Sequence, residues 1–311
     1  MKLSVLTVSY GHRSLLLENV RLSISLNQDF FKKVEWHIAE NSPRDHPDRF
    51  DGDEFGLIVQ EAQSEAGLGI SHHHATALNH LIRTTSLADH VLILDPDFFL
   101  LVPNWAEVIP AYMSSNNLDF FGVPWHPRHG ENYRYFPAVH CFAFDSRRIP
   151  VDTLDFTPLL DHLAWREKPV ARAIRFIPML GYRLIARSWD TGSRIHARYG
   201  RDPYYMSEVT APVYSRNPRY NSRKNRLIEA LLPDDLCLEP KRAGYYTDRT
   251  FVDRGWIKSP LPDQWESFVW NERPFGIHVR RSYASHSRND VEESSCLPPL
   301  LSELREAINK E

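Results

Sequence analysis

Short runs of aliphatic residues alternate with longer amphipathic segments along the first hundred residues. Residues 3–9, 34–39 and 57–60 are apolar and β-rich, which is typical of strands buried on both faces of a parallel sheet. Leucines recur at roughly helical spacing over residues 14–26, and a glycine-containing segment opens a second predicted helix at about 70–83. The order strand, helix, strand, strand, helix, strand predicts an α/β sheet built from βαβ crossovers.

The most informative stretch is the apolar run at residues 91–101, which Asp95 and Asp97 interrupt. Pro96 fixes its own φ and favours an extended Asp95, so we expect the chain to turn there. Two carboxylates beside such apolar sequence are costly to bury without a positive partner. A divalent cation with oxygen ligands would satisfy both, and a diphosphate would complete its coordination. The alternative is a strand end with two solvated aspartates, because Asp-x-Asp alone is a weak motif.

Polar residues follow two further predicted strands at the points where these end. Ser9 and Tyr10 follow the first strand, and Glu40 and Asn41 follow the second. Sheets of this kind bind ligands at the carboxyl ends of their strands. We therefore expect these residues and the paired aspartates to converge on one rim, where they favour a nucleotide site.

Length and composition limit the function classes. The chain has 311 residues, 42% of them hydrophobic and 25% charged, as in an ordinary globular protein. This length suits one large α/β domain with a tail, or two small domains. The net charge of −3 argues against general electrostatic binding of nucleic acid.

Cysteine usage and hydropathy bear on the compartment. Cys141, Cys237 and Cys296 are widely spaced and odd in number, which argues against a disulfide framework or a cysteine zinc site and fits a reducing cytoplasm. The first residues lack the basic and apolar regions of a signal peptide. No apolar run approaches the roughly 20 residues that span a bilayer. We expect a cytoplasmic protein, with any membrane contact peripheral and at the inner face.

Several of these segments resemble the glycosyltransferases of the GT-A fold. The matching pieces are residues 7–10, 39–42 and 67–69 with the helix that follows, then residues 95–97 and 103–105. In this order the chain is most similar to the large family 2 of inverting enzymes. The resemblance covers roughly the first 145 residues well and the remainder loosely.

The resemblance implies a Rossmann-like, mostly parallel central sheet flanked by helices, with an irregular C-terminal extension on the acceptor side. Residues 1–200 would form the core that binds the nucleotide sugar and performs catalysis. Residues 201–311 would supply the acceptor-side extension, a late metal-site strand and a C-terminal helix. A leucine-rich stripe over residues 297–308 predicts that this helix docks on the body, with a dimer interface as the alternative.

Residue by residue, the resemblance implies a donor site. Tyr10 and Glu40 would hold the base and ribose, although the family usually has Asp where Glu40 stands. The full set of expected nucleotide contacts is Ser9, Tyr10, Glu40, Asn41, Gly69 and Asp95.

The resemblance also implies a metal site for Mn²⁺ or Mg²⁺. Asp97, with Asp95 directly or through the ribose, would hold the ion against the diphosphate. His278 resembles the late histidine that completes the metal shell in many GT-A enzymes; the alternative is a buried strand-end histidine. The triplet at residues 72–74 has no family role. Adjacent helical histidines point about 100° apart and cannot all chelate one ion, so helix-surface and core positions are favoured. The alternative is that one of the three hydrogen-bonds a diphosphate.

Asp190 is the predicted catalytic residue. It precedes a helical stretch, and in the family an acid at the start of such a helix acts as general base on the acceptor. Trp189 stands where the family commonly has the first acid of a Glu-Asp pair. The alternative is a helix N-cap, since Asp accepts well from first-turn amides, and both roles can coexist.

With these residues, the resemblance implies a metal-dependent glycosyltransferase of the hexosyltransferase type, and inversion is implied by the resemblance alone. It would move a sugar from a UDP-, GDP- or dTDP-sugar to the hydroxyl of a glycan or lipid-linked acceptor, in bacterial-type surface glycan or glycoconjugate synthesis. A nucleotidyltransferase is the first alternative, but residues 9–13 are too poor in glycine for its phosphate loop. The second alternative is a non-catalytic sugar-nucleotide-binding protein. The presence of Asp95, Asp97 and Asp190 argues against it, because a protein that had lost catalysis would not need these acids.

Overall fold

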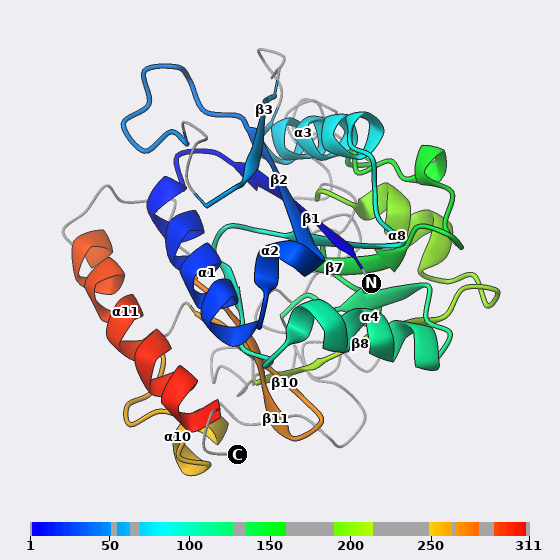
Figure 1. Ribbon diagram of the computed structural model, residues 1–311. Helices are drawn as coiled ribbons and strands as arrows, with labels where there is room; N and C mark the ends of the chain where they lie inside the picture. The colour runs from blue at the N-terminus through cyan, green and yellow to red at the C-terminus, as the bar shows by residue number, and fades with distance from the viewer. Residues whose placement is uncertain are drawn as a thin grey trace, which may run out of the picture.

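In the computed structural model of the protein, a seven-stranded sheet forms the centre of the fold (Figure 1). The structure describes residues 2–50, 55–62, 69–126, 135–159, 190–213, 249–262, 265–279 and 289–308. The strands lie in the order β3 (Ile58–Glu61), β2 (Val34–Glu40), β1 (Leu3–Ser9), β4 (His90–Leu94), β7 (Cys141–Asp145), β6 (Phe120–Gly122) and β8 (Ser207–Val209). Strands β3, β2, β1 and β4 are mutually parallel, whereas β7 runs antiparallel between β4 and β6. The predicted mostly parallel sheet is confirmed.

Strand β1 shows why the run at residues 3–9 is largely apolar. All seven of its residues are buried, because helices cover both faces of the sheet. Leu3 and Val5 pack in one cluster with side chains of α1 (Arg13–Leu26). Leu6 and Val8 pack in another with side chains of α3 (Ile70–Thr84). Each face therefore demands apolar side chains at alternate positions, and together they leave no polar stripe.

In the part of the chain that the structure describes, the remaining helical elements are α2 (Phe30–Lys33), α4 (Trp105–Ser115), a 3₁₀ turn η1 (Val151–Thr153), α8 (Ser193–Tyr199), α10 (Thr250–Asp253) and α11 (Asn289–Ile308). Helix α4 contains Pro110, which is buried inside it. Helix α11 lies beside α1 in Figure 1, and its Leu297, Leu301 and Leu304 are buried in one cluster with leucines of α1. The described part of the terminal helix therefore packs on α1 through this leucine stripe.

The chain changes sheet at the two aspartates. The predicted turn is present, since the Phe98 N–H donates to the Asp95 carbonyl at 3.0 Å. Strand β4 ends at Leu94, and β5 (Phe98–Leu100) enters a second sheet whose order is β5, β11 (Arg273–His278), β10 (Glu266–Trp270) and β9 (Ala211–Val213). Asp95 and Asp97 therefore lie at the junction of the two sheets.

Segments before and after residue 200 share both sheets. Strand β8 pairs with β6, and β11 pairs with β5. The division at residue 200 into a catalytic core and an acceptor-side extension stays a prediction.

Strands β7 and β6 are short. Strand β7 begins at Cys141, whose N–H closes a turn onto the Ala138 carbonyl at 3.1 Å. Strand β6 has three residues, and all of them are buried.

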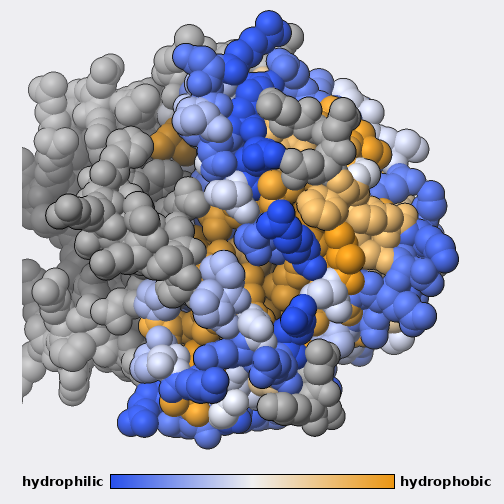
Figure 2. Space-filling model, turned by 60° about the vertical axis from the view of Figure 1, so that its left-hand side comes forward, coloured by the Kyte–Doolittle hydropathy of each residue, from blue (hydrophilic) through white to orange (hydrophobic). Residues whose placement is uncertain are grey.

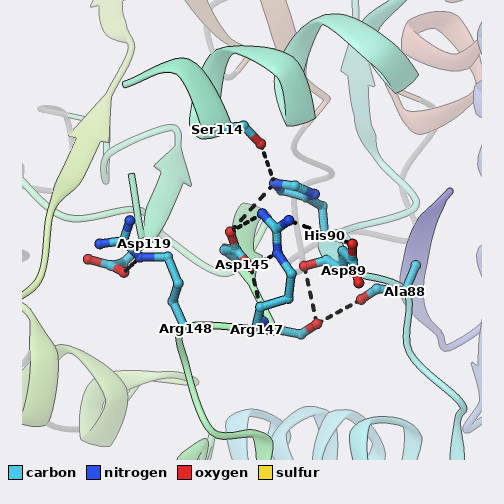
Figure 3. Close-up of polar contacts among 9 residues, drawn as sticks. Ala88, Asp89, His90, Ser114, Asp119, Asp145, Arg147 and Arg148 are labelled. Carbon is cyan, nitrogen blue, oxygen red and sulfur yellow. Dashed lines mark hydrogen bonds and ion pairs between the residues drawn. The ribbon is translucent and has the colours of Figure 1, made fainter. Parts of the chain in front are cut away.

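A polar network closes the sheet at the end opposite the aspartate turn (Figure 3). The Asp145 carboxylate accepts hydrogen bonds from Nε and a terminal nitrogen of Arg147 at 2.9 and 2.6 Å, and it lies 3.8 Å from Nε2 of His90. The Asp119 carboxylate accepts hydrogen bonds from Nε of Arg148 at 2.6 Å and from the Met206 N–H at 2.7 Å. Each of these buried carboxylates thus has an arginine partner.

The surface is chemically mixed on the face that Figure 2 shows. Hydrophobic residues gather near the middle of that face, with hydrophilic residues around and among them. Among the described helices, none combines the length and the apolar character needed to cross a membrane.

Candidate active site

A cavity of about 580 Å³ lies at the carboxyl ends of the parallel strands. Four predicted site residues line it: Tyr10 after β1, Asn41 after β2, and Asp95 and Asp97 after β4. Its other lining residues are Val8, His12, Ser42, Pro43, Ala62, Ile70, His73, His74 and Pro96. The structure thus brings the loops after β1, β2 and β4 together at one rim, with the first turns of α3 beside them.

The two aspartates and His278 form a compact set of ligand atoms. Nε2 of His278 lies 3.3 Å from Oδ1 of Asp97, and the side chains of Asp95 and Asp97 are each 20% exposed. One ligand atom from each of the three residues lies within 4.8 Å of the others. Two carboxylates and one imidazole are ligand types that Mn²⁺ accepts, so the donor set fits a divalent cation.

Strand pairing explains how His278 arrives there. Strand β11 runs antiparallel to β5, with His278 opposite Phe98, and the Val279 N–H donates to the Asp97 carbonyl at 2.8 Å. His278 is 5% exposed. It is therefore both a buried strand-end histidine and a neighbour of the acids, which were the two alternatives weighed from the sequence.

Ser9 and Glu40 lie beneath the cavity rim, and both are buried. The Ser9 carbonyl accepts from the Asn41 N–H at 2.8 Å. The Glu40 carboxylate accepts from the N–H groups of Ser42 and Phe50 at 2.8 and 3.0 Å. In this conformation Glu40 organises the loop after β2, and its contact with a nucleotide stays a prediction.

Gly69 is the residue immediately before α3. Its φ of −72° is accessible to any residue, and a Cβ there would meet no atom within 4 Å. The Gly69 carbonyl accepts from the His72 N–H at 2.9 Å, which starts the helix. The matching Gly67 lies outside the described residues. A nucleotide contact by Gly69 stays a prediction.

Asp190 precedes α8, but it is not the N-cap of that helix. The N-cap is Gly192, whose φ of 82° is in the left-handed region, and the Asp190 carboxylate accepts instead from the Thr191 N–H at 3.0 Å. The N-cap alternative is wrong because the intervening turn separates the acid from the helix. Thr191 also donates its hydroxyl to the Ser71 carbonyl at 3.0 Å, which attaches this turn to the start of α3.

His74 is a site residue that the sequence did not assign. Its Nε2 lies 3.5 Å from Oδ1 of Asp95. Burial lowers the pKa of His74 to about 4, although the charges of Asp190 and Asp97 act to raise it. A neutral imidazole therefore stands among three acids at neutral pH. The only signal in the sequence was the place of the histidine triplet, at the start of a helix that opens on the rim.

No family model matches the chain, and no curated protein matches its sequence. Several solved structures are similar to parts of the chain. The mannosyltransferase PcManGT from Pyrobaculum calidifontis, in complex with GDP-Man and Mn²⁺, is 17% identical over 50% of this chain and 49% of its own, with a TM-score of 0.34. S. aureus TarS in complex with UDP-GlcNAc is 13% identical over 50% of this chain and 48% of its own, at 0.35. Mouse xyloside xylosyltransferase 1 is 8% identical over 68% and 86%, at 0.37.

The first two of these matches span about half of either chain.

Proposed function

We propose that this protein is a metal-dependent glycosyltransferase that moves a sugar from a nucleoside diphosphate sugar to an acceptor hydroxyl. One observation carries the proposal: Asp95 and Asp97 bring ligand atoms close to one of His278, and both acids line a cavity that the loops after β1 and β2 also line. A cavity of about 580 Å³ is within the usual range for small-ligand sites.

The donor would lie along the rim from Tyr10 to Asp97. Tyr10 is 54% exposed, so its ring is available to cover a base. Asn41 lines the same cavity, and its side-chain nitrogen Nδ2 is 3.5 Å from the His73 carbonyl oxygen. Ser9 and Glu40 would act mainly by fixing the backbone that presents Tyr10 and Asn41.

Asp95, Asp97 and His278 would hold Mn²⁺ or Mg²⁺ beside the diphosphate. When bound, the ion would act as a Lewis acid that stabilises the negative charge of the leaving nucleoside diphosphate. The protein's own contribution is to keep two carboxylates and one imidazole nitrogen within reach of one point. His74 would add a neutral hydrogen-bonding group beside Asp95.

Asp190 would be the general base. Its carboxylate would accept the proton of the acceptor hydroxyl as that oxygen attacks the anomeric carbon and the bond to the diphosphate breaks. A single displacement of this kind inverts the anomeric configuration. The attachment of residue 191 to Ser71 supports this role, because it holds the Asp190 turn against the helix that carries His74.

The proposed setting is the assembly of bacterial-type surface glycans or glycoconjugates from glycan or lipid-linked acceptors. The protein would work in the cytoplasm, peripherally at the inner face of the membrane.

Nucleoside diphosphate release from a panel of UDP-, GDP- and dTDP-sugars tests this function. With Mn²⁺ and a mixture of glycan and lipid-linked acceptors, we expect one donor to release its nucleoside diphosphate, and EDTA to stop the release. An Asp119→Asn variant should retain the release, because Asp119 lies at the opposite end of the sheet. Release of pyrophosphate instead would identify a nucleotidyltransferase. Tight donor binding without any turnover would favour the non-catalytic alternative.

A further inference from the structure

Glu266 is a fully buried carboxylate that the proposed chemistry leaves unexplained. It is the first residue of β10, its exposed fraction is 0%, and it lies opposite His278 in the β10–β11 pairing. Its Oε2 is 3.1 Å from Nδ1 of His278. Burying a carboxylate costs free energy unless a partner satisfies it, and here the imidazole is such a partner.

The other ring nitrogen of the same imidazole points toward the proposed metal site. Nε2 of His278 is 3.3 Å from Oδ1 of Asp97, so the ring stands between Glu266 on one side and the aspartate turn on the other. His140 stacks on it with ring centroids 4.6 Å apart and an angle of 16° between the planes. The Phe98 ring lies 5.9 Å away. Packing on the ring therefore fixes its orientation.

The chemistry of the two nitrogens is then determined by Glu266. An ionised carboxylate only accepts hydrogen bonds, so its partner nitrogen must carry the hydrogen. With the hydrogen on Nδ1, a neutral imidazole keeps its lone pair on Nε2, the nitrogen that faces Asp97. A metal ligand needs that lone pair.

We propose that Glu266 is a positioning residue that selects the Nδ1–H tautomer of His278 and thereby prepares Nε2 to bind the cation. The proposal rests on the proposed function, because it assigns the cation to the Asp95, Asp97 and His278 set. A second set, His140, Glu266 and His278, also brings ligand atoms within 4.8 Å of one another, all three residues being buried. In the positioning account Glu266 binds the imidazole and not a cation.

The first test reads the tautomer in the metal-free protein. Nitrogen-15 NMR of histidine-labelled protein, with His278 assigned by comparison with a His278→Gln variant, distinguishes Nδ1–H from Nε2–H. At a pH at which the ring carries a single hydrogen, we expect this hydrogen on Nδ1 in the wild type and a mixture of the two tautomers in Glu266→Gln. Nε2–H in the wild type would overturn the proposal whether or not the variant folds.

The second test measures Mn²⁺ affinity by electron paramagnetic resonance of the free ion. Loss of a carboxylate behind a histidine ligand typically weakens metal binding about 10–100-fold, and we expect this of Glu266→Gln. The matched control is Asp119→Asn, which makes the same change at a buried carboxylate beyond the other end of the sheet. It should leave Mn²⁺ affinity unchanged, even if its melting temperature falls.

The outcomes separate this proposal from the proposed function. A wild type that binds no Mn²⁺ contradicts the metal-dependent function and the preparation of Nε2 for a cation. The tautomer measurement then tests only whether Glu266 holds the hydrogen of His278 on Nδ1. A wild type that binds Mn²⁺ as tightly as a folded Glu266→Gln variant overturns the positioning role and leaves the function standing. A second Mn²⁺ ion per chain that is lost in both His140→Gln and Glu266→Gln would identify Glu266 as a ligand and overturn the proposal.

Discussion

Two clusters of acids lie at opposite ends of the same sheet, and their partners differ. At the amino end of β4, Asp145 and Asp119 are bound by Arg147 and Arg148 (Figure 3). At its carboxyl end, the ion-pair partners that the structure describes for Asp95 and Asp97 are His74 and His278. Arginine is always charged and forms bidentate pairs with carboxylates, whereas histidine is a common metal ligand through one of its ring nitrogens.

Burial shows the same contrast. The side chain of Asp145 is 3% exposed, whereas those of Asp95 and Asp97 are 20% exposed and line a cavity. Burial by itself would raise the pKa of Asp145, but hydrogen bonds from the side chain and backbone N–H of Arg147 outweigh it and the pKa is lowered. The first cluster is complete as a structural element, whereas the second is suited to receive a cation.

The comparison predicts its largest effect for Asp97→Asn. Removing one carboxylate from the metal site should abolish Mn²⁺-dependent nucleotide binding and lower sugar transfer by roughly 10³-fold or more, because the ion supplies several kcal/mol of charge stabilisation. The melting temperature should change little, since a partly exposed rim acid contributes little to the core. Calorimetric titration and a thermal melt of the same preparation measure both. Wild-type transfer by the folded variant would remove Asp97 from the site.

Asp190→Asn should have the next largest effect, and on a different quantity. Losing a general base typically lowers the rate about 10²–10⁴-fold, while the nucleotide and metal contacts lie on other segments. We expect single-turnover transfer to fall within this range and donor affinity to stay within about twofold. The Asn amide oxygen can still accept from the Thr191 N–H, so the local turn should persist. Unchanged transfer would leave Asp190 with a structural role alone.

Asp145→Asn should show the reverse pattern. It replaces the charged acceptor of Arg147 in a buried position, so we expect unfolding to become easier by about 1–3 kcal/mol. Nucleotide affinity should not change, since Asp145 lies at the other end of the sheet. Chemical denaturation of this variant beside Asp97→Asn makes the comparison direct. If Asp97→Asn proved the more destabilising of the two, the assignment of the clusters would be reversed.

The smallest expected effect is the change with acid pH of the difference in free energy of unfolding between the wild type and Asp145→Asn. Because the pKa of Asp145 is lower in the folded state, its contribution is complete above the unfolded-state value of about 3.9 and is lost as pH falls through the folded value. The wild-type advantage over Asp145→Asn should therefore be constant near neutral pH and shrink below about pH 4. Melting curves across this range check it, and an advantage that grows on acidification would contradict it.

Local patterns predicted the part of the site that local sequence builds. Strands β1, β2 and β4 follow from short β-rich runs that are largely apolar, and the turn at Pro96 follows from the geometry of proline. Since parallel strands end at one edge, the meeting of Tyr10, Asn41 and Asp95 also follows.

Contacts between distant segments were less accessible to sequence reasoning. His278 was predicted only through a family resemblance, because it reaches Asp97 by pairing of β11 with β5, almost 180 residues earlier. Glu266 was not predicted at all: its role depends on its register opposite His278, and an acid in an apolar strand gives no such signal. His74 was set aside because helical geometry argued against the triplet as a chelating group, although one member of it faces the acids.

The most direct test is the melting temperature of the wild-type protein with a nucleoside diphosphate, measured with Mn²⁺ and with EDTA. Without a cation, the charges of Asp95 and Asp97 repel a diphosphate, whereas a bound ion joins the two. A ligand at about 100 times its Kd stabilises by about 2.7 kcal/mol, which a thermal melt detects. We predict a clear upward shift for UDP, GDP or dTDP with Mn²⁺ and none with EDTA. Equal shifts under both conditions would contradict a metal-dependent nucleotide site at these acids.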